Sequence, residues 1–78
     1  MSKVQYEYYE SITPADGQQI KRHDAIYIGT GGNLYVKRTA SSVAEKFAVP
    51  SGGLLPVKVY SIEATNTTAT DIKIFRDV

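Results

Sequence analysis

Every apolar run in this chain is short and is closed by glycine, proline, asparagine or aspartate. No window places apolar residues at positions i, i+3, i+4 and i+7 over three turns, as an amphipathic helix requires. β-branched and aromatic side chains dominate the runs and alternate with polar ones, which is the period of a strand. The pattern predicts an all-β fold with strands near residues 4–11, 24–29, 33–38, 43–49, 54–64 and 71–77.

The length of the chain limits how it can be stabilised. It has 78 residues and no cysteine, and no dense set of metal ligands. A chain of this size forms a single hydrophobic core, and neither disulfides nor a zinc ion can cross-link it. A core this small rarely supplies more than about 3–5 kcal/mol. We expect one small antiparallel β-sandwich or partly open β-barrel of about six strands that self-associates or docks onto a larger partner.

The alternation between residues 26 and 36 predicts a hairpin. A three-residue loop at residues 30–32 sets Ile28 opposite Leu34. The next pair is Ile26 and Val36, so all four side chains point to one face. A two-residue loop mixes apolar and polar side chains on each face, and we therefore prefer the longer loop.

In the strand expected at residues 54–64, the alternation of apolar and polar residues shifts by one position. Val57 and Val59 share one face, but Ile62 falls on the other under strict alternation. Either a β-bulge near residues 60–61 re-phases the strand, or both faces are covered. Alternation predicts a core made of Ile26, Ile28, Leu34, Val36, Phe47, Val49, Leu55, Val57, Val59, Ile62, Ile72 and Ile74.

Tyrosine is the main aromatic residue, with six Tyr against two Phe and no Trp. Tyrosine suits half-buried contact surfaces, because its ring supplies area and its hydroxyl tolerates water. Residues 1–11 are predicted to be a tyrosine-rich interaction segment or strand, and residues 12–78 the single all-β domain. Phe75 points away from Ile72 and Ile74 and needs a cover. The candidate interface residues are Tyr6, Tyr8, Tyr9, Tyr27, Tyr35 and Phe75.

The sequence indicates no catalytic, cofactor or metal site. His23, the sole histidine, lies among charged neighbours and is interpreted as an ordinary solvated loop residue. The carboxylates show no EF-hand or Asp-x-Asp spacing. The glycines of residues 29–32 lack the last glycine of a dinucleotide-binding fingerprint, and no helix is expected after them. We expect a protein that is not an enzyme and needs no cofactor.

Charge disfavours nucleic acid as the partner. The formal net charge is +1, and acidic residues are interleaved with basic ones. A phosphate-binding surface needs a more one-sided balance. The alternative is a small barrel that binds single-stranded nucleic acid, with Tyr27, Tyr35 and Lys37 on one outer face of the hairpin. A carbohydrate-binding surface module is a third possibility.

No apolar stretch approaches the roughly 18 residues of a membrane span. Residues 1–7 turn polar too soon for a secretory signal. We expect a chain that is made in a cytoplasm and does not enter a membrane.

Four blocks carry a resemblance to a known family. Ile12-Thr13-Pro14-Ala15-Asp16 fits "I-T-P-x-D", and residues 25–34 fit "A-x-Y-V-G-x-x-G-x-V". Residues 47–60 read roughly as an apolar pair followed by "P-x-G-x-L-P-V-x-V", and residues 64–72 as "A-T-x-T-T-A-x-x-I". In this order the blocks resemble small tailed-bacteriophage virion structural proteins of the spike-base or capsid-decoration type.

The resemblance covers residues 12 to about 74 and implies a non-enzymatic virion component made in the host bacterial cytoplasm. Its implied partners are copies of itself and a phage major capsid protein or spike or fibre protein. Residues 1–11 carry no shared block, so we expect partner choice to lie there. Taken alone, the Thr65–Thr70 run predicts a polar turn; an exposed edge whose hydroxyls bond to a neighbouring subunit is the alternative.

Overall fold

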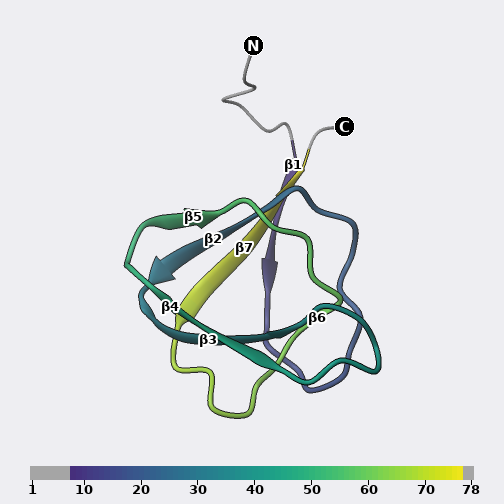
Figure 1. Ribbon diagram of the computed structural model, residues 1–78. Coiled ribbons are helices and arrows are strands. Elements are labelled where there is room, and N and C mark those ends of the chain that lie inside the picture. Colours follow the sequence, from purple (N-terminus) through teal and green to yellow (C-terminus); the bar gives the residue numbers. More distant parts are fainter. Residues whose placement is uncertain (1–7, 77–78) are drawn as a thin grey trace.

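The computed structural model describes residues 8–76. In this range the strands are β1 (Tyr8–Ile12), β2 (Ala25–Thr30), β3 (Gly32–Lys37), β4 (Glu45–Val49), β5 (Gly53–Leu55), β6 (Ser61–Ile62) and β7 (Thr70–Arg76). The same range contains no helix, and hence none that could cross a membrane. One antiparallel sheet has the order β1-β7-β2-β5 and the other β4-β3-β6, as Figure 1 shows. The sheets do not close into a barrel, and the prediction of a small all-β sandwich is confirmed.

Isoleucines line the inner face of the four-stranded sheet. Ile72 on β7 lies between Ile12 on β1 and Ile28 on β2, and Ile74 lies beside Ile26. Leu34, Val36 and Ile62 of the smaller sheet complete the buried cluster. All the predicted core residues are buried in this cluster or pack against it, while the buried Ala69 was not predicted.

The predicted hairpin between residues 26 and 36 is wrong. β2 pairs with β5 and β7, whereas β3 pairs with β4 and β6. The chain therefore crosses from one sheet to the other at Gly31, where an added Cβ would lie 2.5 Å from the Val49 carbonyl oxygen. Ile28 and Leu34 do share one core, but from opposite sheets. Alternation reports which face is buried and not which strand is the neighbour.

The strand expected at residues 54–64 is two short strands in different sheets. β5 ends at Leu55 and β6 begins at Ser61. Pro56 has no N–H to donate, and the Val57 N–H donates to the Leu55 carbonyl at 2.9 Å, which closes a tight turn. The change of phase before Ile62 thus comes from a break in the strand, so both earlier explanations, the bulge and the doubly covered strand, are wrong.

The loop between β1 and β2 extends the smaller sheet beside β6. The Ala15 N–H donates to the Ile62 carbonyl and the Ile20 N–H to the Tyr60 carbonyl, each at 2.9 Å. These bonds satisfy the carbonyls of Ile62 in β6 and of Tyr60 just before it, which point away from β3. They also lay the loop over Glu63, which is only 6% exposed.

Candidate interaction surface

An aromatic patch lies on the outer face of the four-stranded sheet. The ring of Tyr9 meets Phe75 edge-on with centroids 6.3 Å apart, and Phe75 stacks on Tyr27 at 5.9 Å. The Lys73 ammonium lies 5.8 Å from the centroid of Tyr27. Leu54 on β5 is the cross-strand neighbour of Tyr27. We call these five residues the aromatic face.

Strand alternation explains why the aromatic face exists. Ile72 and Ile74 of β7 point into the core, so Lys73 and Phe75 between and beyond them point outward. Tyr9 is 69% exposed and Leu54 is 49% exposed, so the patch is open to solvent at both ends. Contiguous apolar surface of this kind is typical of contact sites.

One cation lies on this face. Lys73 donates a hydrogen bond to the Asp71 carboxylate at 2.8 Å. This bond raises the pKa of Lys73 above its ordinary value, which keeps the ammonium charged. A single lysine paired with a carboxylate is not the basic groove that a nucleic-acid backbone needs.

Tyr8 faces the other way and is engaged within its own chain. The Arg76 guanidinium lies 4.2 Å from the centroid of its ring, and its hydroxyl donates to the Glu10 carboxylate. The bond to Glu10 raises the pKa of Tyr8, and the same bond lowers the pKa of Glu10. The Lys21 ammonium lies 3.3 Å from Glu10. Tyr8 therefore does not join the aromatic face.

Tyr35 lies on β3, in the opposite sheet from Tyr27. The platform of Tyr27, Tyr35 and Lys37 expected for single-stranded nucleic acid is therefore not formed. The structure brings together Tyr9, Tyr27 and Phe75 from the predicted interface set. Tyr6 lies outside the described residues. That these residues form an interface stays a prediction.

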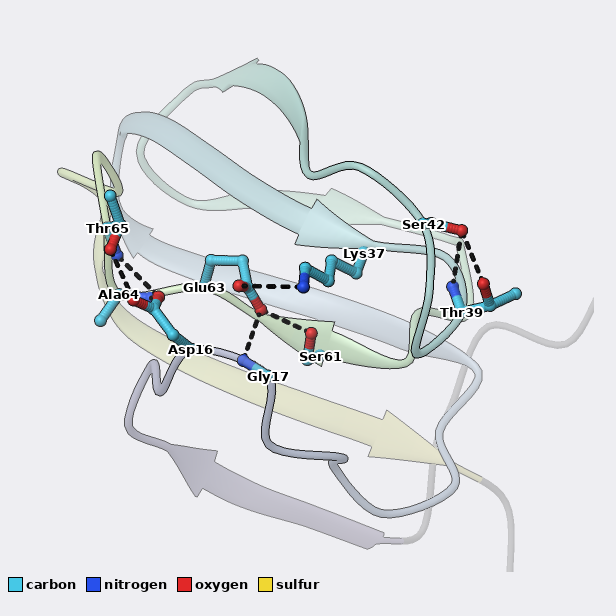
Figure 2. Close-up of polar contacts among 9 residues, drawn as sticks. All are labelled: Asp16, Gly17, Lys37, Thr39, Ser42, Ser61, Glu63, Ala64 and Thr65. Carbon is cyan, nitrogen blue, oxygen red and sulfur yellow. Dashed lines mark hydrogen bonds and ion pairs between the residues drawn. The ribbon is translucent and has the colours of Figure 1, made fainter.

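The two loops beside β6 are held by carboxylates that sequence reasoning missed. Glu63 accepts hydrogen bonds from the Ser61 hydroxyl at 2.6 Å and the Gly17 N–H at 3.1 Å (Figure 2). Asp16 accepts bonds from the Ala64 and Thr65 N–H groups at 2.8 and 2.9 Å, and from the Thr65 hydroxyl. These bonds, chiefly that of the Thr65 hydroxyl, lower the pKa of Asp16. Asp16 closes the "I-T-P-x-D" block, which is the only signal that could have indicated this tie.

The threonine run bonds to its own chain. Thr67 Oγ1 accepts from the Tyr35 N–H at 3.0 Å, and Thr68 Oγ1 accepts from the Asn33 N–H at 2.9 Å. The Thr67 N–H donates to the Ala64 carbonyl at 3.3 Å across Asn66, whose φ is 68°. The polar turn is confirmed. The alternative, in which the hydroxyls bond to a neighbouring subunit, stays a prediction, because Thr67 and Thr68 use their oxygens as acceptors within the chain.

His23 is not solvated, contrary to our interpretation of the sequence. It is 2% exposed, and its Nε2 accepts a hydrogen bond from the Val59 N–H at 3.0 Å. Nδ1 lies 2.8 Å from the Lys21 carbonyl, which makes it the protonated nitrogen of a neutral ring. Charged neighbours in the sequence conceal this burial. Across residues 8–76 no three potential metal ligands gather in a group.

Comparison with solved structures gives a match over most of the chain. No protein-family profile matches the chain, and no curated protein matches it by sequence. A solved chain from the capsid of the native GTA particle, computed with C5 symmetry, matches with a TM-score of 0.82 and 29% identity. The match covers 92% of this chain and 84% of that one. It supports a structural role in a phage-like particle, which is the broader part of what the sequence resemblance implied.

Proposed function

We propose that this protein is a non-enzymatic structural component of a phage-like particle, an oligomeric capsid decoration or spike-base adaptor. The observation that carries the proposal is the likeness to the GTA capsid chain, which runs through 92% of this chain at 29% identity.

The proposed mechanism is geometric. The sandwich is held by a continuous isoleucine-rich core and by loops tied to β3 and β6, so it can present its outer surfaces in fixed positions. The aromatic face is the surface proposed to contact another protein of the particle, either the major capsid protein or a spike or fibre protein. Copies of the chain would assemble with it in the virion after synthesis in the bacterial cytoplasm.

Substitution on the aromatic face tests this role. Tyr9→Asp places a charge on a residue that is 69% exposed, so the fold should survive and docking should fail. Val43→Asp makes a like change at a residue that is 85% exposed and outside the aromatic face. We expect particles purified from cells to contain the Val43 variant and to lack the Tyr9 variant. Equal incorporation of both would contradict the assignment of this face.

Salt separates the proposal from the nucleic-acid alternative. An interface made of buried aromatic area is not screened by ions, whereas phosphate contacts weaken steeply as salt rises. We expect the chain to stay on particles when salt is raised to about 1 M. Release of the chain at that salt, together with affinity for a single-stranded oligonucleotide at low salt, would favour the alternative.

A further inference from the structure

The sandwich is open on the side where the end strands of the two sheets, β4 and β5, lie. A hollow of about 210 Å³ is lined by residues 47–50 and 53–55 together with Ile28. A second hollow, of about 190 Å³, is lined by Glu45, Phe47 and residues 57–59, with Val36 and Arg38. The two hollows lie on either side of Phe47, and we call them together the seam groove.

The seam groove has apolar walls that the chain itself leaves partly uncovered. Its walls include half-buried residues that pack against the core from the open side: Phe47, Val49, Leu55, Val57 and Val59. Within residues 8–76, β4 pairs with β3 alone, so one of its edges is available to another strand. An apolar groove beside a free strand edge is the site that β-strand addition uses.

The spacing of the hollows selects the kind of segment that fits. Along β4, one hollow is centred two residues from the other, since the first contacts residues 47–49 and the second contacts Glu45 and Phe47. In an extended strand, side chains that point to the same side are two residues apart, a distance of about 6.6–6.8 Å. The groove therefore suits apolar side chains at positions i and i+2 of an extended segment.

Residues 1–7, which precede β1, have this pattern. Val4 and Tyr6 are separated by Gln5 and flanked by the charged Lys3 and Glu7. The second hollow is lined by Arg38, Lys58 and Glu45, and the Lys58 ammonium also lies 3.8 Å from the Asp24 carboxylate. Arg38 favours Tyr6 in the second hollow, because Glu7 then lies on the side of its guanidinium.

The origin of the segment points to a neighbouring molecule. β1 is at the opposite edge of the four-stranded sheet from β5, three strand spacings or about 14 Å away. Tyr6 precedes Tyr8 by two residues, which is at most about 7 Å of extended chain, so Tyr6 cannot cross that distance to the seam groove of its own molecule. We propose that the seam groove receives Val4 and Tyr6 of a second copy of this chain, which adds a strand to β4. This inference rests on one part of the proposed function, namely that copies of the chain assemble with one another.

Disulfide trapping in the full chain tests the contact, because the natural sequence contains no cysteine. A Tyr6→Cys chain is mixed with a Val57→Cys chain and oxidised, and the mixed disulfide is measured by mass spectrometry. The matched control replaces Val57→Cys by Val43→Cys, which is exposed and outside both hollows. We expect about tenfold more mixed disulfide with Val57→Cys, because docking raises the local concentration of the thiols.

A second measurement does not depend on cysteine variants. The double variant Val4→Asp, Tyr6→Asp should shift the mass in light scattering to the 8.6 kDa monomer, while Val43→Asp should leave it oligomeric. Equal trapping in both mixtures, or an oligomer that survives the double variant, would overturn the inference. A chain carrying both Tyr6→Cys and Val57→Cys that closes only on itself would also overturn it.

The two proposals fail in different ways. If purified particles hold the chain but Tyr6 and Val57 cannot be trapped, the seam groove is wrong and the structural role stands. If trapping succeeds but purified particles lack the chain, the structural role is wrong and the strand exchange stands.

Discussion

At the scale of single residues, two threonine hydroxyls take the place of a neighbouring strand beside β3. Beyond the short β6, the N–H groups of Tyr35 and Asn33 would have no partner in the sheet, and Thr67 and Thr68 accept them. Replacing backbone partners with side chains lets the chain turn away at Asn66 without leaving donors unpaired. Thr67 and Thr68 therefore have a structural role in this fold, which is to accept hydrogen bonds from backbone N–H groups of β3.

Thr67→Val tests that reason. Valine keeps the shape but removes the acceptor, and an unpaired backbone donor costs about 1–3 kcal/mol. We expect the free energy of unfolding to fall by about that amount in urea denaturation. The control is Thr70→Val at an exposed position of β7, where we expect a change within about 0.5 kcal/mol. Equal effects at the two sites would refute the role of the Thr67 hydroxyl.

Asp16 makes stability depend on pH. Its pKa is lowered in the fold by the Thr65 hydroxyl and by the N–H groups of Thr65 and Ala64. A lowered folded pKa means that the stabilisation is present above the ordinary value near 3.8 and is lost as pH falls through the folded value. We expect the melting temperature to drop on acidification below about pH 4, and to drop less for Asp16→Asn. Thermal unfolding followed by circular dichroism from neutral to acidic pH measures both, and parallel curves would contradict the prediction.

At the scale of elements, Gly31 lets β2 and β3 belong to different sheets. An added Cβ would meet backbone atoms of Val49, Ser51 and Pro50 at 2.5–2.7 Å, and backbone cannot rotate away. Gly31→Ala should therefore destabilise the fold by about 3 kcal/mol or more. Gly17→Ala is the comparison, because φ is +70° but the space is open, so its cost should be about 1–2 kcal/mol. A smaller loss at Gly31 than at Gly17 in urea denaturation would show that the crossing is not tightly packed.

β1 is an edge strand of the four-stranded sheet. The predicted boundary between the interaction segment, residues 1–11, and the all-β domain, residues 12–78, falls inside this strand. The buried cluster is drawn mainly from β2, β3, β6 and β7. We therefore expect deletion of residues 1–11 to leave a folded sandwich that has lost self-association, measured by circular dichroism and light scattering. Unfolding of the shortened chain would show that β1 is an integral strand.

The elements also show how far sequence reasoning reaches. Period-two alternation predicted the residues of the core and most of the strands, because it depends only on local geometry, but it did not predict the break between β5 and β6. It failed on partners: Ile28 and Leu34 face each other across the sandwich, which no local pattern distinguishes from a hairpin. The outward direction of Phe75 followed from alternation. The ties of Glu63 and the burial of His23 did not, because they depend on loops that meet only in the folded chain.

At the scale of the whole molecule, the fold gives the chain two surfaces of different kinds. The aromatic face lies over β1, β7, β2 and β5, and the seam groove lies between β4 and β5, so the two surfaces meet at Leu54. The proposed contacts, of the aromatic face with another protein and of the seam groove with a second copy, would together build a ring or cluster on a larger surface.

Cryo-electron microscopy of purified particles tests whether the chain is a structural component of a phage-like particle. We expect density for the seven described strands, with the aromatic face in contact with another protein of the particle. Mass spectrometry of the same sample should identify the chain. Particles whose map has no such density and whose protein content lacks this chain would contradict the account.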